Sequence, residues 1–139
     1  YLGAALLDQA WHTLTPDEVP RDVRQVEQFE HQALAEAGIN DALVPPRYRT
    51  TYFSHVFAGG YSAAYYAYIW SEVMDADAIE WFTTDGAIDG DLGLNRRAGE
   101  IFRREFLSRG DCRDPLISYR AFTGREPGIL PLLQRRGLA

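Results

Sequence analysis

Apolar residues recur along most of this chain at intervals of three and four positions, the spacing that places them on one face of a helix. Glycine and proline interrupt the pattern where a helix has to end, as Gly38 does after the run from Asp22 to Ala37. Residues 50–57 suit either a short helix or an extended segment. The pattern predicts helices over residues 2–12, 22–37, 61–82, 92–107 and 114–122, and a short last one near 130–133, opened by Glu126-Pro127. We therefore expect an all-α fold, a compact multi-helix fragment with about five or six helices.

The length of 139 residues fits one domain, so residues 1–139 are expected to share a single helical fold. The net charge of -6 disfavours nucleic acid and anionic membranes as partners. No apolar run approaches the roughly 20 residues that a membrane-spanning helix needs. Cys112 is the one cysteine, which favours a reducing compartment and a cytoplasmic location; a cysteine-poor exported, periplasmic protein is the alternative.

The first residues have the character of a helix interior. Residues 1–11 carry apolar side chains at helical spacing, and no capping residue precedes them. We therefore expect the chain to begin inside a larger protein and to pack against the upstream part of the same polypeptide. Apolar surface that has lost such a neighbour tends to associate, so the isolated chain is expected to form a homo-oligomer.

Metal-binding chemistry is weakly represented. Asp8 and His12, and likewise Glu27 and His31, lie four residues apart, but two ligands are too few for a stable metal site. The sequence contains no H-E-x-x-H and no Cys-x-x-Cys. The glycine-rich, acidic stretch 86–93 does not match the register of a calcium loop. We expect no metal to be bound by these residues, and we expect Cys112 and the arginine pairs to be surface groups.

Residues 54–68 hold one histidine, a glycine pair and four tyrosines. On a helix, Tyr61, Tyr65 and Tyr68 fall on one stripe. Their hydroxyls can donate hydrogen bonds to a peptide, or to an oxyanion that forms on a carbonyl under attack. A stripe of this kind is also typical of a half-buried core. Spacing alone leaves both interpretations open.

The sequence resembles a known family over nearly its whole length. The stretches that carry the resemblance are residues 44–49, 52–72 and 108–127. They resemble the thimet-oligopeptidase family of zinc metallopeptidases, and the spacing from His55 to Gly59 is similar to that of its bacterial peptidyl-dipeptidase branch. The resemblance implies a largely helical, two-lobed fold around a deep peptide channel. It also implies a zinc centre built on an H-E-x-x-H helix, which would lie upstream of Tyr1.

The resemblance also implies roles for individual residues. Tyr68 looks like the phenol that stabilises the tetrahedral oxyanion, and His55 like the histidine that binds the peptide backbone or that intermediate. Tyr61 and Tyr65 look like substrate-binding phenols beside the flexible loop at Gly59-Gly60, which would also bind substrate. The implied activity of the parent enzyme is zinc-dependent hydrolysis of short peptides with release of C-terminal dipeptides. The chain alone is expected to be inactive.

Two other hypotheses belong to different functional classes. The chain could be a non-catalytic helical module that binds peptides through its tyrosines without cutting them. It could also be a purely structural helical domain. A gene that begins near Tyr1 without an upstream H-E-x-x-H would favour the binding module.

Overall fold

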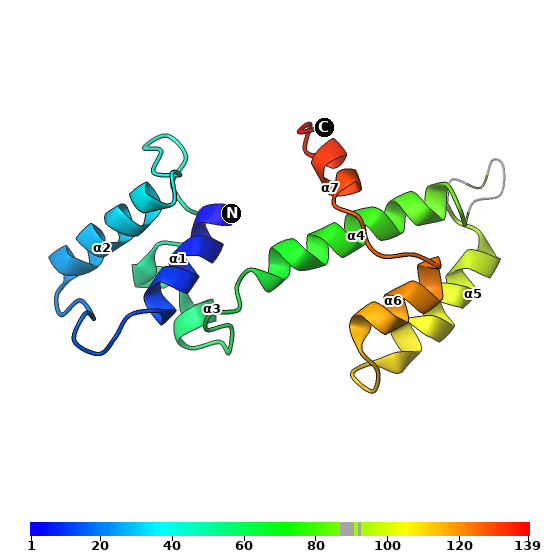
Figure 1. The fold of residues 1–139 in the computed structure, drawn as a ribbon, viewed down its shortest axis with the longest axis horizontal. Coiled ribbons are helices and arrows are strands. Elements are labelled where there is room, and N and C mark those ends of the chain that lie inside the picture. The colour runs from blue at the N-terminus through cyan, green and yellow to red at the C-terminus, as the bar shows by residue number, and fades with distance from the viewer. Residues whose placement is uncertain (87–90, 92) are drawn as a thin grey trace. The chain divides into compact units, whose positions relative to one another are not determined.

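The computed structural model describes residues 1–86, 91 and 93–139, and these residues form helices, turns and loops without a strand (Figure 1). The α-helices are α1 (Leu2–His12), α2 (Val23–Glu36), α3 (Ser54–Phe57), α4 (Ala67–Thr83), α5 (Arg96–Glu105), α6 (Pro115–Thr123) and α7 (Leu130–Arg135). Two short 3-10 helices, η1 (Thr50–Tyr52) and η2 (Leu107–Arg109), complete the set. The all-α prediction is confirmed. None of the helices in the described part of the chain is long and apolar enough to cross a membrane.

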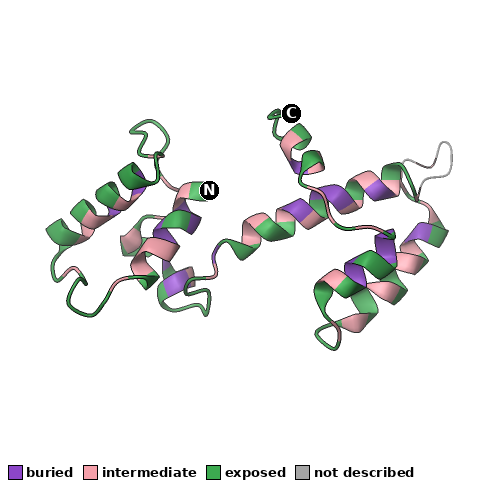
Figure 2. Cartoon of the chain, viewed as in Figure 1, coloured by how far each residue is buried: buried purple, intermediate pink, exposed green. Residues whose placement is uncertain are grey.

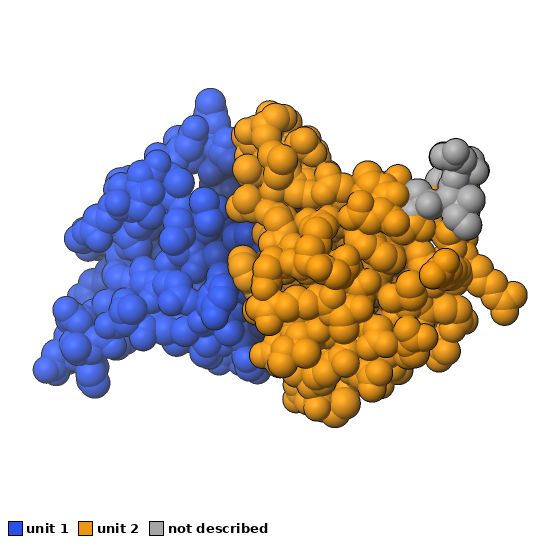
Figure 3. Space-filling view, turned by 45° about the vertical axis from the view of Figure 1, so that its right-hand side comes forward, with its two compact units in different colours: residues 1–69 blue, residues 70–139 orange. Residues whose placement is uncertain are grey.

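The chain divides into two compact units, residues 1–69 and residues 70–139, with the boundary inside α4 (Figure 3). Buried residues occur in the helices of both units (Figure 2). Each unit therefore has its own core, and the two are described separately.

In the first unit, α1 packs against α2. The side chain of Asp22 caps the start of α2 by accepting a hydrogen bond of 2.9 Å from the Gln25 N–H. The helix ends before Gly38, whose φ of +71° an L-residue rarely adopts. Both ends of the predicted helix over residues 22–37 are thus confirmed, and local signals in the sequence account for them.

The core of the first unit collects side chains from segments far apart in the sequence. Its buried members are Ala4, Ala5, Phe53, Val56 and Tyr65. The ambiguous stretch 50–57 forms η1 and α3, which supply Phe53 and Val56. Glu30 of α2 holds the start of η1, since its carboxylate accepts a 2.9 Å hydrogen bond from the Thr50 N–H. Residues 50–57 therefore form short helices and not an extended segment.

In the second unit, two helices begin at side-chain caps. Asn95 caps α5 through the Arg97 N–H at 2.7 Å, and Asp114 caps α6 through the Leu116 N–H at 2.8 Å. Gly124, with φ +78°, ends α6 close to the end predicted at residue 122. The caps set where α5 and α6 begin, and the two helices pack together over a core that contains Trp81, Ala98 and Phe122.

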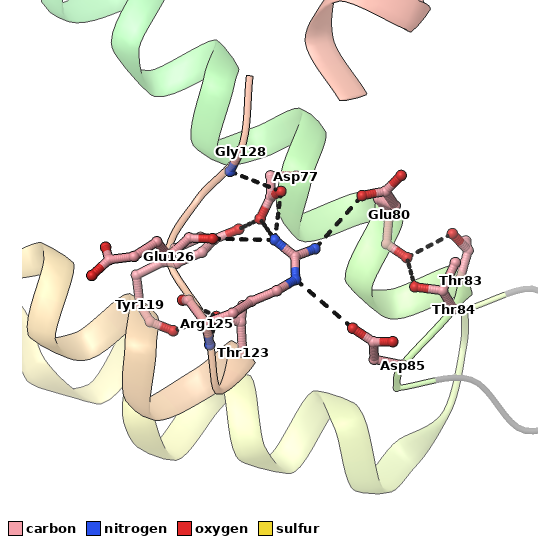
Figure 4. A network of polar contacts seen from close by, with 10 residues as sticks. All are labelled: Asp77, Glu80, Thr83, Thr84, Asp85, Tyr119, Thr123, Arg125, Glu126 and Gly128. Carbon is pink, nitrogen blue, oxygen red and sulfur yellow. Dashed lines mark hydrogen bonds and ion pairs between the residues drawn. The ribbon is translucent and has the colours of Figure 1, made fainter. Parts of the chain in front are cut away.

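A buried aspartate organises the chain that follows α6. Asp77 of α4 is 1% exposed and accepts hydrogen bonds from the Tyr119 hydroxyl, from Arg125 and from the Gly128 N–H (Figure 4). The Arg125 Nη1 lies 2.6 Å from both carboxylate oxygens. Arg125 also faces Glu80 at 3.6 Å and Asp85 at 3.8 Å. This network ties the irregular segment before α7 to α4.

Several predicted boundaries are wrong. The longest helix begins at Ala67 and not at Tyr61, because residues 62–66 form turns. The helix expected from Leu92 begins at Arg96, after its Asn95 cap; Leu92 itself lies outside the described residues. Glu126-Pro127 does not open the last helix, since α7 begins at Leu130 with Pro131 in its first turn. The described chain has seven α-helices rather than five or six, because the single turn α3 counts as one.

Candidate functional site

The segment of residues 59–66, which we call the tyrosine loop, leaves α3 through a tight turn. A Cβ on Gly59 would lie 2.9 Å from the carbonyl oxygen of His55, so only glycine fits there. Gly60 follows with φ +78°, a conformation that glycine adopts readily. The Tyr61 N–H then donates to the His55 carbonyl at 3.1 Å. The glycine pair thus folds the chain back, so that Tyr61 lies beside His55.

Ala63 is the one non-glycine residue with positive φ, at 54°, among the residues that the structure describes. For an L-residue this conformation costs about 1–2 kcal/mol. Two side chains of α1 hold the peptide groups of Ala63 in place. Asp8 accepts from the Ala63 N–H at 2.9 Å, and Gln9 donates to the Ala63 carbonyl at 2.7 Å. This clamp explains why the loop does not continue the helix of α4 toward Tyr61.

His55 lies at the centre of a group of rings that we call the aromatic cluster. Its ring is 4.8 Å from that of Tyr48 and about 6 Å from those of Tyr61, Tyr65 and Tyr68, centroid to centroid. Its Nδ1 is buried and has no hydrogen-bond partner among the described residues. A buried polar atom without a partner is costly and is often found at functional sites.

Tyr61 and Tyr68 form a stacked pair in front of this histidine. Their ring centroids are 5.2 Å apart and their planes differ by 24°. A hydrogen bond with Tyr61, together with partial burial, raises the pKa of Tyr68 to about 12. The Tyr68 hydroxyl therefore keeps its proton through neutral pH and remains a hydrogen-bond donor. A neutral phenol held in this way can stabilise negative charge on a neighbouring oxygen.

Tyr65 occupies a different environment from the other two tyrosines. It is 2% exposed and its ring packs edge-on against Phe53 at 4.9 Å, whereas Tyr61 is 38% exposed. Burial raises the pKa of Tyr65. The two interpretations of the tyrosine stripe are thus divided among its members: Tyr65 belongs to the core, Tyr68 is partly buried against the core, and Tyr61 is exposed. The substrate-binding role expected for Tyr65 stays a prediction.

A shallow pocket of about 250 Å³ lies beside these groups and is lined by Ser54, His55, Ala58, Gly59 and Tyr61. A cation lies beside the Tyr48 ring of the cluster. The Arg47 guanidinium is 5.7 Å from the ring centroid of Tyr48, and a hydrogen bond with Tyr48 raises the pKa of Arg47. The pocket and the cluster together present a phenol pair, an imidazole and a nearby positive charge.

Sequence reasoning missed two members of this arrangement. The sequence pattern presents Asp8 only as half of a metal pair, although it is the one acid in the apolar helix of residues 2–11, which is a sign of a buried polar role. Tyr48 lies in the matching stretch 44–49, where the pattern assigns it no role, yet its ring stacks on Phe53 at 5.2 Å and contacts His55. Because both contacts join residues distant in sequence, periodicity could not reveal them.

The other candidate groups have ordinary partners. The His12 Nδ1 lies 2.9 Å from an Asp8 carboxylate oxygen, and the His31 Nε2 lies 2.8 Å from the Asn40 amide. The described residues contain no group of three or more His, Cys, Asp or Glu side chains that could hold a metal. Cys112 is exposed. The glycine-rich stretch 86–93 lies largely outside the described residues.

Most arginines of the predicted surface pairs form ion pairs. Arg103 contacts Glu100 at 2.9 Å, Arg104 contacts Glu105 at 2.8 Å, and Arg135 contacts Asp75 at 2.7 Å. Arg136 pairs with Glu72. The side chains of these four arginines are exposed, so they are surface groups, as expected. Exposed ion pairs of this kind contribute little to stability.

Known proteins match this chain from one end to the other. It is 45% identical over 137 residues to a dipeptidyl carboxypeptidase of Salmonella typhimurium and 44% identical to the Escherichia coli protein of that name; each match covers 99% of this chain and 19% of the relative. It is 35% identical over 140 residues to an organellar oligopeptidase A of Arabidopsis thaliana, covering 99% of this chain and 17% of that protein. The chain spans about a fifth of the length of the curated relatives it matches.

A family profile matches the chain over nearly its whole length as well. The profile of peptidase family M3 matches residues 2–138, which include α1 with Asp8 as well as the tyrosine loop. The match therefore covers every residue of the aromatic cluster. This chain belongs to peptidase family M3.

Proposed function

We propose that this chain is the C-terminal portion of the catalytic domain of a zinc metallopeptidase that hydrolyses short peptides and releases C-terminal dipeptides. Membership of the family and the similarity to two proteins named dipeptidyl carboxypeptidase support this activity. The observation that carries it is the meeting of the His55, Tyr61 and Tyr68 rings beside a pocket that His55 and Tyr61 line, with the buried Nδ1 of the histidine lacking a partner among the described residues.

In this proposal the chain contributes one wall of the active site. The Tyr68 hydroxyl donates a hydrogen bond to the oxygen that becomes negative when the scissile carbonyl is attacked, and its pKa of about 12 keeps the donor protonated. His55 binds the peptide or the intermediate through Nε2. Tyr61 stacks on Tyr68 and donates to the peptide backbone. Gly59, Gly60 and Tyr65 complete the substrate-binding set.

Zinc does not fit the described residues of this chain, which hold no cluster of metal-binding side chains. The proposal therefore places the metal on residues outside the chain, upstream of Tyr1, and assigns to the chain only the binding of peptide and the stabilisation of charge. A cytoplasmic location is part of the same proposal, supported by the single cysteine.

The test is the kinetics of Tyr68→Phe in the full-length protein that carries this segment. Loss of an oxyanion donor lowers kcat by roughly 10- to 1000-fold and changes KM little, because the hydrogen bond forms in the transition state. Cleavage of a short peptide with a free carboxyl end measures both constants, and mass spectrometry of the products identifies a released dipeptide.

Tyr66→Phe is the matched control. Tyr66 is an exposed tyrosine of the same loop and makes no ring contact within the described part of the chain. Its substitution should leave kcat and KM within about two-fold of the wild type. An unchanged kcat in Tyr68→Phe would contradict the assigned role.

A further inference from the structure

Asp8 is a buried carboxylate on an otherwise apolar face of α1. It is 0% exposed, and Ala4, Ala5 and Leu7 around it are buried as well. Burying a carboxylate is costly unless hydrogen bonds satisfy its oxygens. The Ala63 N–H donates to Oδ1 and the Tyr65 N–H to Oδ2, both at 2.9 Å, and these donors lie more than fifty residues away in the sequence.

These bonds act on the tyrosine loop rather than on α1 itself. They fix the N–H groups of Ala63 and Tyr65, which lie between the two tyrosines that stack in front of His55. Gln9 holds the Ala63 carbonyl as well. Without such partners Ala63 would leave its positive φ, and Tyr61 would lose its place beside Tyr68.

The remaining neighbour of the carboxylate is a histidine. The His12 Nδ1 lies 2.9 Å from Oδ1 and 2.8 Å from the Asp8 carbonyl oxygen. His12 is exposed, whereas the Asp8 side chain is completely buried. Each carboxylate oxygen of Asp8 thus accepts a hydrogen bond from one N–H of the tyrosine loop, and Oδ1 also contacts His12.

We propose that Asp8 is a positioning residue for catalysis, which sets the place of Tyr61 and Tyr68 through the backbone of the tyrosine loop. This inference rests on the proposed function. A positioning role differs from a purely structural role in what it predicts for Asp8 variants. A structural role predicts lower stability, and a loss of rate that does not depend on whether Tyr68 is present. A positioning role predicts that the loss of rate caused by removing Asp8 passes through Tyr68.

The experiment is a double-mutant cycle between Asp8→Asn and Tyr68→Phe in the full-length protein. Asparagine keeps the size of the side chain, but its NH₂ group cannot accept from the loop N–H that it faces. Misplacement of a catalytic group by about 1 Å can cost on the order of 100-fold in rate. We expect Asp8→Asn to lower kcat by roughly 10- to 100-fold, with a smaller change in KM, in the presence of Tyr68. In the Tyr68→Phe background the same substitution should cost less than about three-fold, since coupled residues are not additive.

A second measurement reports the clamp without relying on activity. Hydrogen exchange of the segment 61–66 follows the Ala63 and Tyr65 amides that bond to Asp8. We expect faster exchange there in Asp8→Asn and unchanged exchange in α2. Asp77→Asn is the matched control, because Asp77 is equally buried but bonds to Gly128 in the second unit. Its effect on rate should be the same with and without Tyr68.

Each outcome separates the two proposals. Unchanged exchange in the loop, or an equal loss of rate in both backgrounds, overturns the positioning role while a Tyr68-dependent kcat upholds the proposed function. A wild-type protein that cleaves no peptide overturns the proposed function and with it the catalytic role of Asp8.

If Asp8→Asn does not fold, Gln9→Ala removes the other half of the clamp from a less buried position. It should lower kcat about two- to five-fold, again only when Tyr68 is present.

Discussion

Each unit buries an aspartate, and the two aspartates are satisfied in different ways. Asp8 in the first unit bonds to two backbone N–H groups of the tyrosine loop and to a histidine. Asp77 in the second unit bonds to one backbone N–H, a tyrosine hydroxyl and a guanidinium (Figure 4). The first arrangement fixes the path of a loop, whereas the second pairs opposite charges. Buried acids that look alike in sequence thus serve geometry in one unit and electrostatic stability in the other.

The partners of Asp77 also determine the direction in which its pKa is shifted. Burial acts to raise it, but the hydrogen bonds from Arg125, Tyr119 and Gly128 outweigh burial and lower the pKa from its ordinary value of 3.8. The same network raises the pKa of Tyr119, through burial and its bond to Asp77. The carboxylate is therefore held in its charged form by its partners.

The largest effect is expected from Asp77→Asn. The substitution leaves Arg125 without its main counter-charge, and breaking a buried pair costs about 3–5 kcal/mol. We expect about 2–4 kcal/mol, because the Arg125 side chain is 35% exposed and keeps some hydration. Hydrogen exchange of the Gly128 amide measures the loss of opening free energy. The tyrosine loop should exchange as in the wild type, and faster exchange there would remove the distinction between the two aspartates.

A middle-sized effect is expected from a methyl group at Gly59. Gly59→Ala places a Cβ 2.9 Å from the His55 carbonyl oxygen, so the backbone at the site has to shift, at a cost of about 1–3 kcal/mol. The control is Gly99→Ala in α5, where a Cβ meets nothing within 4 Å. It should stabilise the protein by about 0.5–1 kcal/mol. Denaturant unfolding measures both, and changes of the same sign would contradict this account of Gly59.

The smallest effect is expected from acid. Because the folded pKa of Asp77 lies below its unfolded value, its contribution to stability is complete above about pH 4 and is lost as the pH falls through the folded pKa. Near-ultraviolet circular dichroism between pH 7 and pH 2 follows this loss. Asp77→Asn should remove that part of the pH dependence, and Asp75→Asn, at an exposed ion pair, should not. A stability that rises as the pH falls below 4 would contradict the lowered pKa.

Local signals in the sequence predicted much of the fold. Gly38 ends the helix predicted over residues 22–37, and the structure confirms it; the caps Asp22 and Asp114 and the terminator Gly124 likewise act within a few residues of their own positions. The tyrosine loop could not be predicted in this way. Its shape depends on Asp8, and helical spacing placed Tyr61 on a helix that begins only at Ala67.

The candidate site was predicted by resemblance more than by pattern. The motif identified His55, Tyr61 and Tyr68, and the structure brings the three rings together. Spacing could not separate Tyr65, because whether a phenol faces the core is decided by Phe53 and other distant residues. The contacts of Tyr48 and Asp8 are of the same long-range kind.

The bond from Asp8 to the tyrosine loop also bears on the order of folding. Asp8 and Ala63 are 55 residues apart, so the loop takes its final form only after the intervening chain has closed on itself. Contacts of such separation form slowly compared with a helical turn. The pairing of Tyr61 with Tyr68 is accordingly a late product of folding, and a chain still being synthesised carries the tyrosines without the surface that they later form.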